Sequence, residues 1–151
     1  MNIHMSMNNK LSLFFWYSIT PLIIGTMVYL MIGSMDTFIY KMASYFIGHD
    51  ILLNLRMDIA LTSVIQNHLA DGLWAFSLTS TLVLFFHQAY SRQVLLLISM
   101  ISLLGFELAQ HLSWIHGTAD IYDLVIMVLC AALAFFITTK KQPYVQLLET
   151  H

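Results

Sequence analysis

The sequence predicts an all-α, polytopic membrane protein with four transmembrane helices and an amphipathic interfacial segment between the first and the second. Two observations lead to this prediction. The chain of 151 residues is 59% hydrophobic and 9% charged, whereas about a quarter of the residues in a typical soluble domain are charged. The apolar residues also gather in runs long enough to cross a hydrocarbon core of about 30 Å. We therefore expect a single membrane domain over residues 1–151.

The first apolar run covers residues 11–32, directly after Lys10. At about 1.5 Å per residue, a helix of this length spans the membrane. A cleavable signal peptide would have a shorter apolar region followed by a small-residue cleavage site, so we expect this helix to be retained. Pro21 lies inside the run and is expected to kink the helix unless neighbouring groups compensate.

Residues 35–66 have a mixed composition and are expected to form the interfacial segment. Between residues 38 and 46, apolar side chains recur at helical spacing and leave Lys41 and Ser44 on the opposite face. Such an amphipathic helix is expected to lie in the plane of the membrane interface. Gly48 is expected to end it.

A second short helix is expected to follow, capped by Asp50 and continuing to about Gln66. A rival interpretation makes residues 51–65 a short transmembrane span. Arg56 and Asp58 argue against the span, because a charged residue costs about 2.5–3.5 kcal/mol at the middle of the bilayer.

Three further apolar runs predict the remaining spans, at residues 73–90, 94–112 and 121–138. Trp74 lies near the start of the second span, as is typical of tryptophans at a membrane interface. Arg92 lies in a very short turn, so the second and third spans must be antiparallel. Gly117 and Thr118 supply turn-forming residues before the last span.

Four spans place both termini on one side of the membrane. Lys10, Arg92, Lys140 and Lys141 then share that side. Because Lys and Arg concentrate on the cytoplasmic side, we expect a multi-pass protein of the inner (plasma) membrane with both termini in the cytoplasm. Polar residues from three separate segments then converge at the outer face.

Ionisable side chains are costly in lipid, so they mark places that face protein or water and have a use. Glu107, Gln110 and His111 share one face of a helix through their i, i+3, i+4 spacing. Asp120 and Asp123 share a face at the start of the next helix, where carboxylates complement the helix dipole. The expected binding residues are Asp71, Trp74, Glu107, Gln110, Asp120 and Asp123.

The same acids also suit structural or catalytic roles. Asp120 could simply cap the last helix, and Glu107 could be bonded to Ser77 or Gln110 and hold the bundle together. Acid–base chemistry is a further alternative, with Glu107 as general acid or base and His111 assisting as the second candidate catalytic residue. The sequence has no Gly-x-Ser-x-Gly nucleophile motif, which weighs against an enzyme.

The residues also bear on cofactors and partners. A metal site could be built on Glu107 and His111, whose spacing is i, i+4, if His68, Asp120 and Asp123 approach them. However, the sequence has no His-Glu-x-x-His motif, and a catalytic zinc usually has more imidazole or thiolate ligands, so we expect no metal and no cofactor. The single Cys130 lies in an apolar run and is expected to be a packing residue. No basic patch suggests nucleic acid. A homodimer or a partner in a membrane complex stays open, although no Gly-x-x-x-Gly seam supports a dimer.

Three short motifs occur in order along the chain. They are His68-Leu-Ala-Asp71-Gly-Leu-Trp74-Ala-Phe-Ser77-Leu-Thr79, Phe106-Glu107-Leu-Ala-Gln110 and Gly117-Thr-Ala-Asp120-Ile-Tyr-Asp123-Leu124. With these motifs, residues 67–136 resemble the VanZ-like family of small bacterial membrane proteins, which is related to a teicoplanin-resistance protein. The chain departs from the family pattern at Ala70, where the family often has proline.

The resemblance implies a role in teicoplanin-type antibiotic resistance, and it carries over to the six expected binding residues, whose roles are not settled in the family. We therefore expect a membrane protein whose outer-face polar pocket binds an amphiphile, an envelope lipid or a lipoglycopeptide. The alternatives are an intramembrane enzyme acting on a lipid or lipid-linked substrate, with Glu107 as acid or base, and a structural subunit of an envelope complex.

Overall fold

In a computed structural model of the chain, helices account for 89% of the described residues, and no described residue lies in a strand. The described residues are 7–33, 35, 38–56, 63–114 and 120–141. Four segments in these ranges are helical, long and apolar enough to cross a membrane: Asn8–Ile32, His68–Phe86, Arg92–His111 and Ile121–Lys141. The predicted all-α, multi-pass architecture is therefore confirmed.

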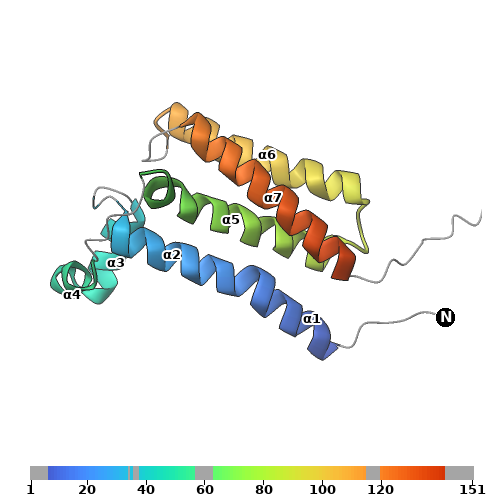
Figure 1. The fold of residues 1–151 in the computed structure, drawn as a ribbon, viewed down its shortest axis with the longest axis horizontal. Coiled ribbons are helices and arrows are strands. Elements are labelled where there is room, and N and C mark those ends of the chain that lie inside the picture. Colours follow the sequence, from blue (N-terminus) through green and yellow to red (C-terminus); the bar gives the residue numbers. More distant parts are fainter. Residues whose placement is uncertain (1–6, 34, 36–37, 57–62, 115–119, 142–151) are drawn as a thin grey trace, which may run out of the picture.

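The first spanning segment is a continuous rod made of three helical pieces. These are α1 (Met7–Phe14), the π-helical turn η1 (Phe15–Ile19) and α2 (Thr20–Ile32). Two short helices follow, α3 (Phe38–Ile47) and α4 (His49–Leu55). The other long helices are α5 (Ser63–Phe86), α6 (Arg92–His111) and α7 (Ile121–Lys141). In Figure 1 the long helices lie side by side, and α3 and α4 lie beside the end of α2.

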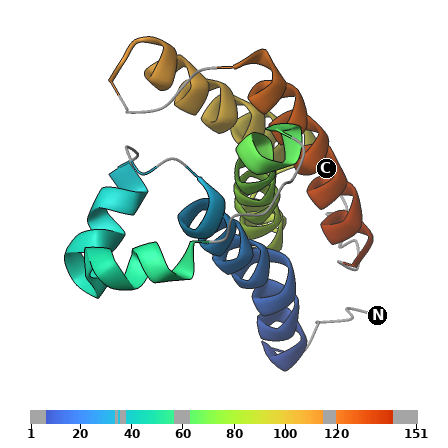
Figure 2. The ribbon, with the colours of Figure 1, turned by 60° about the vertical axis from the view of Figure 1, so that its left-hand side comes forward.

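The helix at the centre of the bundle is α5. It contacts the α1–α2 rod, α6 and α7, and its contact with α7 is the most extensive in the molecule (Figures 1 and 2). Of the spanning window in α5, 44% is buried inside the protein, against 11% in the first rod and 17% in α6. The outer helices therefore present most of their apolar side chains to lipid, while α5 is the element around which they are placed.

The proline inside the first rod is accommodated by the π turn that precedes it. Pro21 has no N–H to donate, and its ring collides with the carbonyl four residues earlier in a regular α-helix. The chain widens at η1, where both the backbone N–H and the hydroxyl of Thr20 donate to the carbonyl of Phe15, the hydroxyl at 3.0 Å. Ser77 of α5 donates to the carbonyl of Ser18 at 2.7 Å. Neighbouring groups therefore do compensate for the proline.

Small residues bring α5 and α7 close together. A Cβ placed on Gly72 would lie 2.9 Å from Cγ2 of Ile126 and 3.0 Å from Sγ of Cys130. Further along α7, Ala131 and Ala134 are fully buried. Small side chains let helix backbones approach in a membrane, where dispersion contacts and hydrogen bonds replace the hydrophobic effect as the driving force. Cys130 is in direct packing contact at this seam.

The amphipathic segment forms a helical hairpin that is tied to the bundle by Arg56. The Arg56 guanidinium donates to the Gly33 carbonyl at 2.9 Å and lies 5.9 Å from the ring centroid of Tyr40, which is buried. Tyr45 and Phe46 are 85% and 75% exposed, so the apolar face predicted for α3 points away from the bundle. This is the arrangement of a helix that lays its apolar face into a membrane interface.

The boundaries around this hairpin differ from those expected. Gly48 ends α3 as predicted, but Asp50 is not the cap of α4, because Gly48 with φ of +100° precedes that helix and no side chain caps it. The helix α4 ends at Leu55, so the rival span over residues 51–65 is not a single helix. Asp58 lies outside the described residues.

The second spanning helix also begins earlier and ends earlier than the run at residues 73–90 predicts. It starts at Ser63, so Gln66 belongs to α5 rather than to the amphipathic segment, and it stops at Phe86. The polar residues in its first turns were expected to form a connection. They can be helical because His68 and Asp71 face other helices of the bundle rather than lipid.

The charged residues divide between the two ends of the bundle. At the end where α1 begins and α7 ends lie Lys10, Arg92, Lys140 and Lys141, which we call the basic end (Figure 1). At the opposite end lie Asp71, Glu107, Asp120 and Asp123, which we call the acidic end. The convergence of polar residues from separate segments at one end is thus present in the fold.

Replacement of Gly72 by alanine is expected to destabilise the protein by about 1–3 kcal/mol, because the added methyl collides with α7 and forces the two helices apart. Thermal unfolding in detergent micelles, followed by circular dichroism, measures the loss. Gly105→Ala is the matched control, because a Cβ there meets nothing within 4 Å. Equal stability of the two variants would contradict the close approach of α5 and α7.

Candidate functional site

A buried ion pair joins α5 to α7 at the acidic end. His68 lies in the second turn of α5 and Asp123 in the first turn of α7, and the imidazole Nδ1 contacts the carboxylate Oδ1. The two side chains are only 8% and 10% exposed. A charge this deeply buried needs a partner, so each group satisfies the other. The pair fixes how the ends of the two helices meet.

Two further carboxyls lie close to this pair. Asp71 follows His68 by one helical turn, within hydrogen-bonding reach of Asp123 and close enough to interact electrostatically with Glu107 of α6. Glu107 in turn interacts with Asp123 and Asp120. Three helices therefore bring four acids into one cluster. Among the described residues, His68 is the one basic group that acts on Asp71.

A cavity of about 290 Å³ adjoins this cluster and runs along α5. Leu22 of α2 and Phe106 of α6 form opposite walls, and Asp71, Trp74 and Leu78 of α5 form its floor. From Asp71 to Leu78 the floor extends about 10 Å, at about 1.5 Å per helical residue. The cavity is thus an apolar groove between α2 and α6 with a carboxyl at the end nearest the acidic cluster.

The polar groups of this groove are few. Ser102 lines it, but its hydroxyl donates to the Ile98 carbonyl of its own helix at 2.9 Å. The indole Nε1 of Trp74 is buried and has no hydrogen-bond partner among the described residues. The Trp74 ring lies against Tyr29 of α2, with 5.3 Å between the ring centroids. Among the residues that line the groove, Asp71 is therefore the one with an ionisable side chain.

The other expected site residues have mixed outcomes. Asp120 caps α7 as predicted, because its carboxylate accepts a hydrogen bond from the Tyr122 N–H at 3.1 Å. Gln110 is half-buried near the end of α6. Ser77 is bonded to the first rod and not to Glu107.

The pairing of Glu107 with His111 is not the arrangement that the structure contains. His111 is the last residue of α6, and its side chain is exposed, whereas Glu107 is half-buried beside the other acids. The histidine that does contact a carboxylate is His68. From the sequence, His68 is considered only as a group that could approach Glu107 and His111 in a metal site, and it is not among the expected binding residues. The i, i+3 spacing of His68 and Asp71 is the signal that could have included it.

These groups suit some ligands and not others. Among the described residues, no three His, Cys, Asp or Glu side chains are placed to hold a metal ion. An acidic cluster beside an apolar groove instead suits a molecule with a cationic or hydrogen-bond-donating head and an apolar chain.

Comparison with known proteins adds no relative to this description. The chain matches no protein-family model, no curated protein and no solved structure. The resemblance to the VanZ-like family therefore stays a prediction from three motifs. Any function must be argued from the groove and the acidic cluster themselves.

Replacement of His68 by leucine is expected to cost about 3–5 kcal/mol, because it leaves the Asp123 carboxylate buried without its partner. The double variant His68→Leu/Asp123→Leu is expected to be more stable than this single variant, since it removes both charges. The free energies of unfolding of the wild type, His68→Leu, Asp123→Leu and the double variant, measured in detergent, form a double-mutant cycle that gives the coupling energy of the pair. A coupling energy near zero would show that the two side chains do not depend on each other.

Proposed function

We propose that this protein binds an amphiphile that enters from the membrane, with its polar head at Asp71 and its apolar chain in the groove along α5. The observation behind the proposal is the composition of the groove, whose lining is apolar apart from the Asp71 carboxyl, the Ser102 hydroxyl and the Trp74 indole N–H. Ligand sites commonly combine an apolar lining with a few convergent polar groups.

The charges at the acidic end favour one kind of head group. Asp71, Glu107 and Asp123 interact with one another, and His68 is the basic group among them. An amine or a cluster of hydroxyls would gain charge-assisted hydrogen bonds from these carboxyls. An anionic phosphate would be repelled. The proposed ligand is therefore cationic or rich in hydrogen-bond donors, not an ordinary anionic phospholipid.

The size and placement of the groove favour an apolar chain over a compact ligand. Its volume of about 290 Å³ is at the low end of cavities that enclose a drug-sized molecule. Leu22 and Leu78 line it and are 43% and 38% exposed, so the groove is open along the side that faces lipid. A chain could slide in laterally while the head stays at the level of the acidic end.

The proposal extends to membrane and orientation. The excess of Lys and Arg at the basic end supports a cytoplasmic location for that end and for both termini, in a bacterial plasma membrane. The acidic end then faces the cell exterior, where envelope lipids, lipid-linked cell-wall precursors and lipoglycopeptide drugs are met. Teicoplanin has an amine-bearing peptide core and an acyl chain, and it is the ligand that the family resemblance suggests.

Direct binding is tested with 12-bromododecylamine, a cationic amphiphile whose bromine quenches tryptophan fluorescence. In a Trp16→Phe/Trp114→Phe background only Trp74, which lines the groove, reports. Saturable quenching is expected in phosphatidylcholine nanodiscs. Asp71→Asn is expected to weaken the apparent affinity about tenfold or more, because hydrogen bonds to charged groups contribute about 1.5–3 kcal/mol.

Two neighbouring substitutions on α6 separate a groove effect from a general one. Ser102→Phe fills the groove and is expected to abolish saturable quenching, whereas Ile101→Phe places the same ring on a residue that is 59% exposed and outside the groove. If the amphiphile quenches Trp74 in both variants as it does in the parent protein, the groove does not hold its alkyl chain. If 12-bromododecyl phosphate quenches Trp74 as well as the amine does, the proposed charge preference is wrong.

A role in resistance is tested in a sensitive host that expresses the chain. A rise in the inhibitory concentration of teicoplanin is expected, with little change for vancomycin, which lacks the acyl chain. Ser102→Phe and Glu107→Gln are expected to remove the rise at equal expression, and Ile101→Phe to retain it. No change for either drug would exclude teicoplanin protection while leaving the amphiphile site to the binding experiment.

A further inference from the structure

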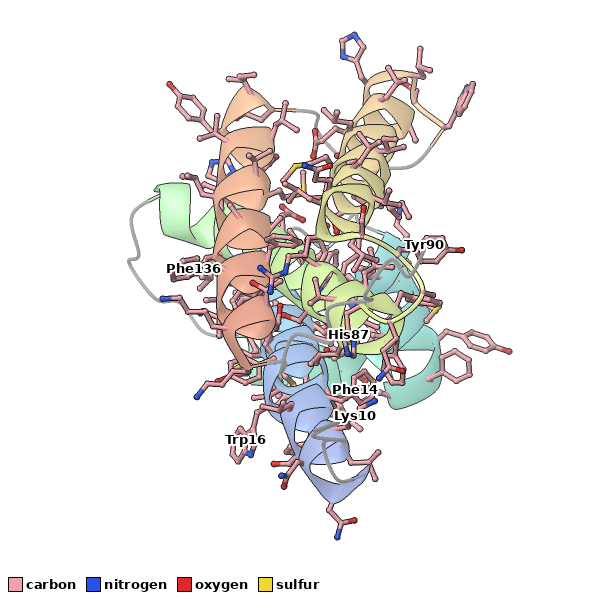
Figure 3. The ribbon with its side chains drawn as sticks, turned by 90° about the vertical axis from the view of Figure 1, so that its right-hand side faces the viewer. Lys10, Phe14, Trp16, His87, Tyr90 and Phe136 are labelled. Carbon is pink, nitrogen blue, oxygen red and sulfur yellow. The ribbon has the colours of Figure 1, made fainter. Side chains whose placement is uncertain are left out.

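Two basic side chains, Lys10 and His87, lie near each other at the basic end of the bundle. Lys10 lies on α1, and His87 lies directly after the last residue of α5 (Figure 3). Phe14 and Phe85 hold these segments together through an edge-to-face contact, with 4.9 Å between ring centroids. Lys10 and His87 therefore lie on either side of the contact between α1 and the end of α5.

Among the described residues, no acid is found to act on His87. Partial burial and the nearby Lys10 charge hold the pKa of His87 below its usual range. Nδ1 of His87 lies 3.3 Å from the Leu84 carbonyl, so this nitrogen is the donor and Nε2 is left to take up a second proton. The described acids are Asp50 and the four that define the acidic end, all far along the bundle. Protonation of His87 would place a second positive charge beside Lys10, and an anion between the two groups would relieve their repulsion.

We propose that Lys10 and His87 bind the phosphate of an anionic phospholipid at the basic end, between α1 and the end of α5. The ammonium and the imidazolium both donate hydrogen bonds to phosphate oxygens. Basic pockets between transmembrane helices are a known way to hold anionic head groups. Trp16 and Tyr90, which are 62% and 50% exposed near this pair, suit the level of the head groups.

The other basic residues at this end make it possible to distinguish a specific lipid site from non-specific electrostatic attraction. The Lys140 ammonium lies 4.1 Å from the ring centroid of Phe136 on its own helix, and Lys141 is exposed beside it. Both add to the general positive potential of the basic end. Neither shares the contact between α1 and α5. Lys141 therefore serves as a matched control for charge alone.

The experiment uses the full chain in a nonionic detergent and measures lipid retention by native mass spectrometry. Phosphatidylglycerol is expected to be retained in preference to phosphatidylcholine with the same acyl chains. Lys10→Gln is expected to lower phosphatidylglycerol affinity about fivefold, the effect of one basic residue near an anionic surface. Lys141→Gln is expected to change it less than twofold, and Lys10→Arg to retain it.

A pH series tests the part played by His87. An anion beside His87 favours the imidazolium, so binding takes up a proton and phosphatidylglycerol affinity is expected to rise as the pH falls from about 8 to about 5.5. The basic groups on the neighbouring helices are Lys10 of α1 and Arg92 at the start of α6, so a His87 variant is needed to assign the pH dependence. His87→Gln is expected to remove the pH dependence while leaving the preference over phosphatidylcholine.

Three results would overturn the proposal. Equal losses for Lys10→Gln and Lys141→Gln would mean diffuse attraction. Equal retention of phosphatidylcholine would remove the charge preference. Displacement of the lipid by an equal concentration of inorganic phosphate would make the ligand a soluble anion. Thermal unfolding of each variant accompanies the series, and Lys10→Arg, which keeps the charge, decides the outcome if Lys10→Gln unfolds early.

Discussion

The close approach of α5 and α7 is the constraint on which the rest of this structure depends. Gly72 lets the two backbones come together against Ile126 and Cys130, and the seam continues through the small residues of α7. That approach sets the register in which His68 meets Asp123. Once these helices are fixed, α6 and the first rod occupy the other faces of α5, and the groove between them follows. A membrane protein this small has few buried side chains, so one glycine contact decides much of its geometry.

The number and type of helices could be predicted from the sequence because hydropathy and length are local properties. The Asp120 cap was predictable for the same reason, since it needs only its own helix start. The beginning of α5 was not, because polar residues at a helix end resemble a connection unless their partners are known. His68 is helical and buried since it meets Asp123, 55 positions later in the chain. The candidate site shows the same division: its acids were predicted, and the histidine and the groove beside them required the packing of separate helices.

The two ends of the bundle present opposite chemistry to the two membrane surfaces. At the acidic end, carboxyls from three helices lie beside a mostly apolar groove. At the basic end, Lys10 and His87 have no described acid near them. Because a groove adjoins its carboxyls, the acidic end is suited to selecting a ligand. The basic end is suited to holding the protein at a fixed depth.

The π turn before Pro21 has a consequence for the direction of α1. A π turn holds one residue more than an α turn, and one residue rotates a helix by about 100°. Everything on the N-terminal side of Phe15 is therefore turned by that angle relative to a regular continuation of α2. In an uninterrupted helix, the face that now carries Lys10 and Phe14 toward the end of α5 would point elsewhere. A proline near the middle of the membrane thus aims side chains that lie about three turns away, at the membrane surface.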